Sequence, residues 1–163
     1  KTGMRLGELT SLDVDDVDLD RGEITLKFKK KRSNRVLFLD NEAIAVLDRW
    51  LAGRRKRKGA ESQALFLSET GTRITKRPVE EMIRKHAARV GLHDPDADRL
   101  EDRFTPHCCR HWFVTHLLRA GMSRDYVKEL RGDSRGEPID IYNHIGKEEL
   151  RESYLAHIPQ LGV

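Results

Sequence analysis

Residues 105–118 read TPHCCRHWFVTHLL and decide how the centre of this chain folds. Thr105 followed by Pro106 predicts the start of a helix, because threonine can cap the free amides of the first turn and proline loses no needed donor there. The apolar residues of the segment recur at helical spacing and predict a buried face: Phe113, Val114, Leu117 and Leu118. We therefore expect a core helix that begins at Pro106 and continues to Gly121.

His107 and Arg110 lie in the first turn of this predicted helix. The N-terminus of a helix attracts anions because its backbone amides are unpaired, and an arginine fork can donate two hydrogen bonds to a phosphate. Arg5, in a second predicted helix, is the other arginine that could bind such a phosphate. A short H-x-x-R pattern also arises by chance, and His107 alone could be an ordinary histidine near a helix cap.

Outward from this segment, the chain is predicted to be mainly α-helical with a small antiparallel β-sheet, an α+β fold in one domain of 163 residues. The expected helices are residues 4–12, 41–51, 75–90, 106–121, 123–132, 139–144 and 147–157. The expected strands are residues 23–28, 36–39 and 64–67, the first two forming a hairpin with a lysine-rich turn. The core face of the third helix is expected to consist of Val79, Ile83, Ala87 and Val90.

The charge pattern fits two interpretations: a surface that binds a polyanionic partner, or an ordinary solvated surface with short basic runs. Charged residues make up 36% of the chain and the net charge is +4, with basic runs in residues 27–35 and 49–58 and acidic clusters in residues 13–20 and 94–102. This separation predicts an electrostatically two-sided molecule with one side facing phosphates. The side chains expected to contact the phosphates of such a partner are Lys27, Lys31, Arg32, Arg35, Arg54, Arg55 and Lys56.

Several other classes of protein are not supported. No apolar run approaches the length that crosses a bilayer, so we expect a cytoplasmic protein. Cys108 and Cys109 are adjacent, and adjacent cysteines rarely bridge each other. Their spacing with His107 and His111 matches no usual zinc site, and the chain has no glycine-rich phosphate loop, so neither a metal nor another cofactor is expected.

Four segments, in order, resemble the signature blocks of the tyrosine recombinases, the family of phage integrases and Xer-like enzymes. The segments are residues 2–9 (TGMRLGEL), the hairpin lysines ahead of residues 35–39 (RVLFL), residues 105–111 (TPHCCRH) and residues 139–144 (IDIYNH). The resemblance implies the fold of the recombinase catalytic domain. It also implies that residues 1–163 are a C-terminal catalytic fragment, whose DNA-clamping N-terminal domain lies upstream of Lys1.

The resemblance assigns a role to five side chains. Arg5 and Arg110 look like the arginines that bind the scissile phosphate, and Glu8 resembles the acid that supports them. His107 looks like the histidine that accepts a proton from the nucleophile, and Tyr142 looks like that nucleophile. The implied reaction is site-specific recombination, in which Tyr142 forms a 3′-phosphotyrosyl link and a 5′-hydroxyl later reverses it. The family acts as a tetramer on DNA, with residues 147–163 as candidates for exchange between subunits, while the isolated chain is expected to be a monomer.

Two positions leave alternatives open. The general-acid lysine is Lys30 when counted back from Arg35 and Lys29 when counted forward from Gly22. Asp133 stands where the family usually has a histidine or tryptophan that donates to the phosphate. An ionised aspartate repels phosphate, so Asp133 either turns away to pair with a nearby arginine or belongs to a variant catalytic site. The alternative function is therefore a catalytically silenced, integrase-like module that only binds DNA.

Overall fold

The computed structural model describes residues 1–27, 35–99, 103–132 and 145–163. Its helices are α1 (Leu6–Ser11), α2 (Asn41–Arg54), α3 (Lys76–Arg89), α4 (Pro106–Arg119), α5 (Arg124–Arg131) and α6 (Lys147–His157), with a short 3-10 helix η1 (Val14–Asp16). Its strands are β1 (Val17–Asp18), β2 (Glu23–Leu26) and β3 (Arg35–Phe38). The prediction of a mainly helical fold with a small sheet is therefore confirmed.

The sheet is antiparallel with the order β1-β2-β3. The expected hairpin forms between β2 and β3, and its register places Ile24 opposite Leu37 and Leu26 opposite Arg35. The alternation in β2 places Ile24 and Leu26 on the buried face of the sheet. A register shifted by one residue would turn both side chains to the other face, so their burial fixes the observed register. The predicted helix at residues 139–144 lies outside the described residues.

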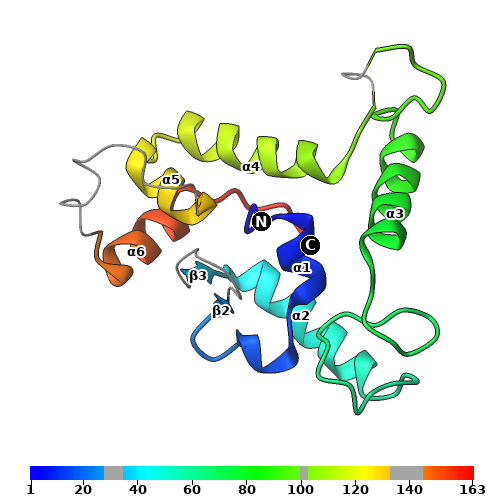
Figure 1. Ribbon diagram of the computed structural model, residues 1–163. Helices are drawn as coiled ribbons and strands as arrows, with labels where there is room; N and C mark the ends of the chain where they lie inside the picture. The colour runs from blue at the N-terminus through cyan, green and yellow to red at the C-terminus, as the bar shows by residue number, and fades with distance from the viewer. Residues whose placement is uncertain (28–34, 100–102, 133–144) are drawn as a thin grey trace.

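One core joins the sheet to the C-terminal helices (Figure 1). It is built around buried residues of β3, α4, α5 and α6: Leu37, Phe38, Phe113, Leu117, Val127, Leu130 and Tyr154. The predicted start of α4 is correct, because Thr105 is its N-cap and Pro106 its first residue. Since Phe113 and Leu117 are held in this core, the first turn of α4 is fixed in position relative to the sheet and α5.

The third strand was predicted at the wrong place. Residues 64–67 form no strand; Ala64 makes an isolated bridge with Asp13 and Leu67 makes one with Arg73, while β1 supplies the third strand. The reason is that side chains of α2 donate hydrogen bonds to backbone carbonyls of this segment, which would otherwise accept from a neighbouring strand. The Trp50 indole donates to the carbonyl of Leu65 at 3.0 Å, and the Arg54 guanidinium donates to that of Ala64 at 2.7 Å.

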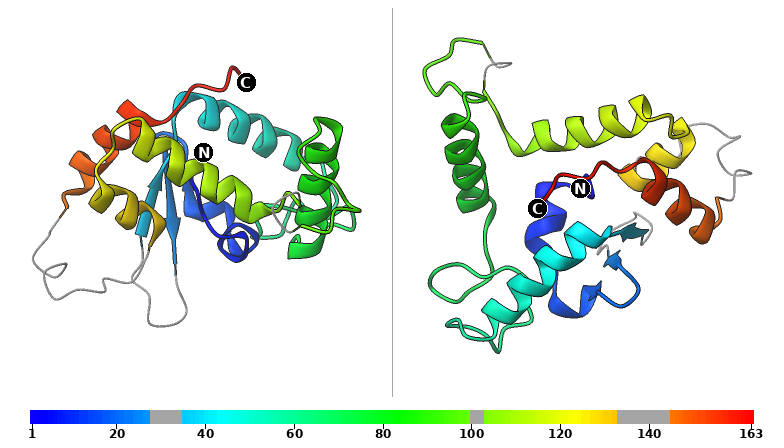
Figure 2. Two further views of the ribbon diagram at one scale, coloured as in Figure 1. Left: turned by 90° about the horizontal axis from the view of Figure 1, so that it is seen from above. Right: turned by 180° about the vertical axis from the view of Figure 1, so that it is seen from behind.

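Helix α3 lies at the outer edge of the molecule in all three ribbon views (Figure 1, Figure 2), where it packs against α1. Val79 and Ala87 are buried as expected, but Val90 is 70% exposed, contrary to the prediction. Val90 is the C-cap of α3 and follows the last helical residue, so it extends beyond the part of the helix that meets the core. Among the described residues, no helix combines the length and apolar character needed to span a membrane.

Candidate functional site

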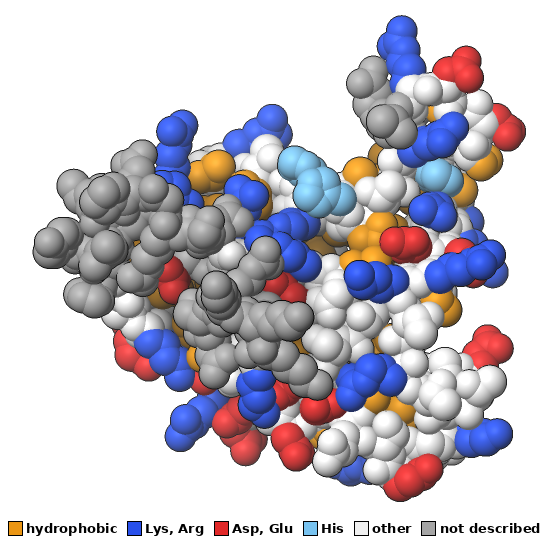
Figure 3. Space-filling model, in the orientation of Figure 1, with side chains coloured by type: hydrophobic (Ala, Val, Ile, Leu, Met, Phe, Trp, Pro, Cys, Tyr) orange, Lys and Arg blue, Asp and Glu red, His pale blue; other side chains and the backbone are white. Residues whose placement is uncertain are grey.

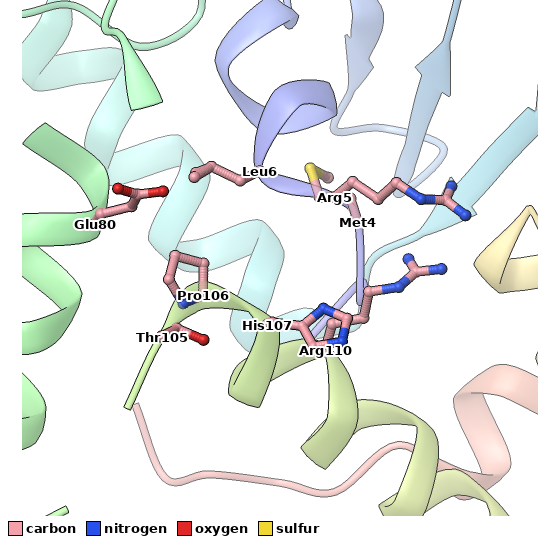
Figure 4. A pocket seen from close by; sticks show the side chains of 8 residues that line it. All are labelled: Met4, Arg5, Leu6, Glu80, Thr105, Pro106, His107 and Arg110. Atoms are coloured by element: carbon pink, nitrogen blue, oxygen red, sulfur yellow. The ribbon is translucent and has the colours of Figure 1, made fainter. Parts of the chain in front are cut away.

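A pocket of about 230 Å³ lies between the start of α1, the start of α4 and helix α3. Figure 4 shows its lining: Met4, Arg5, Leu6, Glu80, Thr105, Pro106, His107 and Arg110. It therefore brings together three of the residues that the sequence singled out, although Arg5 and His107 are far apart in the chain. The pocket opens at the N-terminus of α4, where backbone amides favour an anion.

The two arginines are fixed by one carbonyl oxygen. Arg5 Nη1 donates to the carbonyl of Arg131 at 3.2 Å, and Arg110 Nη2 donates to the same carbonyl at 2.9 Å. Arg110 is buried, and its Nη1 also donates to the carbonyl of Gly3. Figure 4 shows the two guanidinium groups extending in the same direction from α1 and α4. The end of α5 thus holds two permanent positive charges side by side.

Glu8 pairs with Arg5 and with a third arginine, Arg35. Its side chain is buried, and its Oε1 accepts from Arg5 Nη1 at 3.1 Å while its Oε2 accepts from the Arg5 amide at 2.7 Å. Arg35 Nη2 donates to the same Oε2 at 2.8 Å. Burial by itself raises the pKa of Glu8, but the Arg5 amide and the two guanidinium groups lower it, and the net effect is a pKa below its ordinary value. Glu8 is therefore held ionised between two arginines.

His107 lies on the exposed wall of the pocket, one turn before Arg110. Its ring packs edge-on against His111, with the ring centroids 4.3 Å apart. Residues four positions apart lie on the same face of α4, so the His111 ring packs beside the imidazole that lines the pocket. An exposed imidazole in this position can exchange a proton with a group that enters from outside.

The expected DNA-contacting side chains fall into two groups. Lys27, Arg55 and Lys56 are exposed, and Lys27 Nζ lies 2.6 Å from a carboxylate oxygen of Asp16. Arg35 and Arg54, by contrast, are buried, which contradicts their predicted place on a DNA-facing surface. Arg35 donates to Glu8, and Arg54 donates to the backbone carbonyls of residues 60, 62 and 64. The prediction is therefore corrected for both residues, whose guanidinium groups donate hydrogen bonds to buried acceptors of the protein and not to a partner at the surface.

Charges of both signs are interspersed on the face shown in Figure 3, where Lys and Arg side chains occur both in the middle and at the edge.

Several predicted site residues lie outside the described residues: Lys29, Lys30, Lys31, Arg32, Asp133 and Tyr142. The structure also adds features that the sequence reasoning missed. Glu80 of α3 lines the pocket, and it faces the start of α4 from the side away from the two guanidinium groups (Figure 4). The carbonyl of Arg131 is a second such feature; a backbone acceptor carries no sequence signal of its own.

Comparison with known proteins gives consistent results. A sequence model of the phage integrase family matches residues 1–149. The chain is 34% identical to the tyrosine recombinase XerC of Pelotomaculum thermopropionicum over 97% of its length, covering 51% of that protein. It is also 34% identical to the tyrosine recombinase XerD of Bifidobacterium longum over 98% of its length, again covering 51% of the relative.

Solved structures agree with the sequence comparison. The crystal structure of XerA recombinase matches 98% of this chain with a TM-score of 0.73 and 30% identity, and 55% of that chain is covered. The XerH site-specific recombinase bound to its difH substrate matches 93% of this chain with a TM-score of 0.68 and 26% identity, and 42% of that chain is covered. The chain thus spans about half the length of the relatives that it matches.

Proposed function

The chain belongs to the phage integrase family of tyrosine recombinases, and from this premise we propose that it cuts and rejoins DNA strands in site-specific recombination. In this proposal residues 1–163 form the C-terminal catalytic domain of a longer protein, because the relatives are about twice as long. The observation that carries the proposal is the pair formed by Arg5 and Arg110, which share one backbone acceptor and line one pocket with His107.

The arrangement suits phosphodiester chemistry. Attack on a phosphate builds up negative charge on the non-bridging oxygens, and preorganised cations in a partly closed pocket stabilise that charge. Arg110 is buried and Arg5 is partly buried, so neither side chain has to be ordered during the reaction. Glu8 and the carbonyl of Arg131 restrict the orientation of both guanidinium groups before DNA arrives.

We assign the remaining steps to the residues that match the family pattern. The phenol oxygen of Tyr142 attacks the phosphorus, the bond from phosphorus to the 5′-oxygen breaks, and His107 takes the phenol proton. Lys30, or alternatively Lys29, gives a proton to the departing 5′-oxygen. The phosphotyrosyl link conserves the energy of the broken bond, so the 5′-hydroxyl of a partner strand can reverse the step without a cofactor.

The proposed partner is double-stranded DNA. Lys27, Arg55 and Lys56 are exposed cations that could contact phosphates, and we add Lys31 and Arg32 of the hairpin segment from the sequence. We further propose a tetramer on DNA in which residues 147–163 contact a neighbouring subunit, and a monomer in its absence. A chromosomal substrate would place the protein at the nucleoid, in the cytoplasm.

Covalent trapping tests the proposal. The protein in its full natural length is incubated with nicked duplexes made from the genomic DNA around its own gene, and adducts are mapped by mass spectrometry. We expect a DNA adduct on Tyr142 that Tyr142→Phe abolishes without loss of DNA affinity. An adduct that appears only with Asp133→His would instead support a silenced DNA-binding module. An adduct on a different tyrosine would refute the assignment of Tyr142.

A further inference from the structure

Arg35 is a buried cation that the proposed chemistry does not use. It is the first residue of β3, directly after the lysine-rich segment 28–34, and it pairs with Leu26 in the hairpin register. Its side chain is only 6% exposed, so it cannot serve as a phosphate contact on the surface. A buried charge is costly unless an opposite charge compensates it, so the groups that contact the Arg35 guanidinium indicate its role.

The first partner is Glu8. The ion pair between Arg35 Nη2 and Glu8 Oε2 measures 2.8 Å, and both groups are almost fully buried. The other carboxylate oxygen of Glu8 accepts from Arg5 at 3.1 Å. Arg35 and Arg5 thus hold one carboxylate from two sides, and any displacement of Arg35 allows Glu8, and with it Arg5, to move.

The second contact is with the end of α5. Gly132 is the C-cap of that helix, with φ 62° and ψ 43°, and a Cβ atom there would lie 1.9 Å from Arg35 Nη1. The guanidinium therefore lies directly against the last turn of α5, where the helix dipole favours a cation. The carbonyl of Arg131 in that same turn accepts from Arg5 and Arg110. Arg35 consequently contacts both of the elements that fix the two site arginines.

We propose that Arg35 is a positioning residue for the phosphate-binding arginines: it holds Glu8 and the last turn of α5 in the arrangement that aligns Arg5 with Arg110. This inference rests on the proposed function, because alignment matters to catalysis only if the two arginines hold a phosphate.

The test compares Arg35→Gln and Arg35→Lys with a matched control, Arg21→Gln. Arg21 is 72% exposed and pairs with Asp18, so its replacement removes the same charge without touching the pocket. The first readout needs no DNA: carbon-13 NMR titration of the Glu8 carboxyl group. We expect Arg35→Gln to raise the pKa of Glu8 by about 1 or more, because a buried carboxylate loses an opposite charge, and Arg21→Gln to leave it unchanged.

The second readout is single-turnover cleavage of a nicked duplex by the full-length protein. We expect Arg35→Gln to lower the rate constant at saturating DNA by about 100-fold, as misalignment of catalytic groups does, while the Kd for DNA changes less than about threefold. Arg35→Lys should restore part of the rate, because an ammonium can hold Glu8 but cannot also cover the end of α5. A loss of DNA affinity with an unchanged rate constant would make Arg35 a DNA contact and overturn the proposal.

The two readouts separate the possible failures. If the parent protein shows no cleavage with any duplex, the proposed function fails, and the Glu8 titration still decides whether Arg35 holds that carboxylate. If the parent cleaves and Arg35→Gln cleaves equally fast, the positioning role is wrong and the proposed function stands. If Arg35→Gln loses its cooperative melting transition, the cleavage rate constant of Arg35→Lys is the test instead. A rate constant equal to that of the parent refutes the positioning role, and a reduced rate constant in a folded protein supports it.

Discussion

Replacement of Gly132 by alanine probes the contact between α5 and Arg35, and the chain offers a matched control. Gly132 and Gly91 both end helices with positive φ, 62° and 73° respectively. A Cβ atom on Gly91 would meet nothing within 4 Å, whereas one on Gly132 would lie 1.9 Å from Arg35 Nη1 and 2.6 Å from its Cζ. The two substitutions therefore share the backbone strain and differ in the displacement of one guanidinium group.

The magnitudes follow from this difference. A side chain in the left-handed region costs about 1–2 kcal/mol, and this is the whole expected effect of Gly91→Ala. Gly132→Ala also forces Arg35 away from Glu8, which removes a charged hydrogen bond worth about 1.5–3 kcal/mol. We therefore expect Gly132→Ala to lower the free energy of unfolding by about 2.5–5 kcal/mol in total.

Urea denaturation of both variants and the parent provides the assay. The expected result is a clearly lower midpoint for Gly132→Ala than for Gly91→Ala, with the same slope of free energy against urea. Equal midpoints for the two variants would show that the guanidinium moves aside at no cost, and would refute the reasoning that ties α5 to Glu8 through Arg35.

Three further predictions follow from the described contacts. The pKa of Glu8 lies below its ordinary 4.5, so the ionised carboxylate stabilises the fold above pH 4.5, and this stabilisation is lost as the pH falls through the lowered pKa. Urea unfolding measured at a series of pH values should show a smaller loss of stability at acid pH for Glu8→Gln than for the parent, and identical profiles would contradict the assignment. Arg54→Met leaves the carbonyls of Ala60, Ser62 and Ala64 without their buried donor, so it should lower the free energy of unfolding by about 3 kcal/mol. The same substitution at exposed Arg55 should cost less than about 0.5 kcal/mol, and equal melting temperatures of the two variants would show that Arg54 is dispensable. Glu80 lines the pocket at the start of α4 and Glu81 does not. If this pocket holds a DNA phosphate, Glu80→Gln should tighten DNA binding by about two- to threefold at low salt, whereas Glu81→Gln should not. Fluorescence anisotropy measures both affinities, and equal effects would count against a phosphate in this pocket.

Much of the fold could be predicted from local patterns. Thr105 and Pro106 mark the start of α4, and Gly132 marks the end of α5 in the left-handed conformation that favours glycine. The alternation from Glu23 to Phe28 predicts a strand that forms a hairpin with residues 36–39, and β2 and β3 do pair in this way. These features depend on neighbouring residues, and for that reason they can be read from the sequence alone.

The burial of two arginines could not be read from charge. Arg54 and Arg55 are adjacent in one basic run, yet only Arg54 is buried. Helical spacing does contain a signal that the charge hides: Arg54 follows Leu47 by seven residues and Trp50 by four, so it continues the apolar face of α2. Arg35 gives no comparable signal, because its partner Glu8 comes from a distant segment and only the tertiary structure brings the two together.

The site itself was predictable only in part. Arg5, Glu8, His107 and Arg110 were identified from short motifs, and the structure brings them together at one end of α4. The assignments of Tyr142, Asp133 and the general-acid lysine remain predictions, since those residues lie outside the described parts of the chain. The carbonyl that aligns the two arginines belongs to the backbone, and because every residue has one, the sequence does not indicate which carbonyl has this role.

The central claim is that the pocket at the start of α4 holds the DNA phosphate that is attacked. A crystal structure of the full-length Tyr142→Phe variant bound to the nicked duplex that gives the adduct tests it most directly. We predict a backbone phosphate within hydrogen-bond distance of Arg5, Arg110 and His107, with residue 142 facing its phosphorus. A duplex bound elsewhere on the surface, with no phosphate in contact with Arg110, would contradict the account.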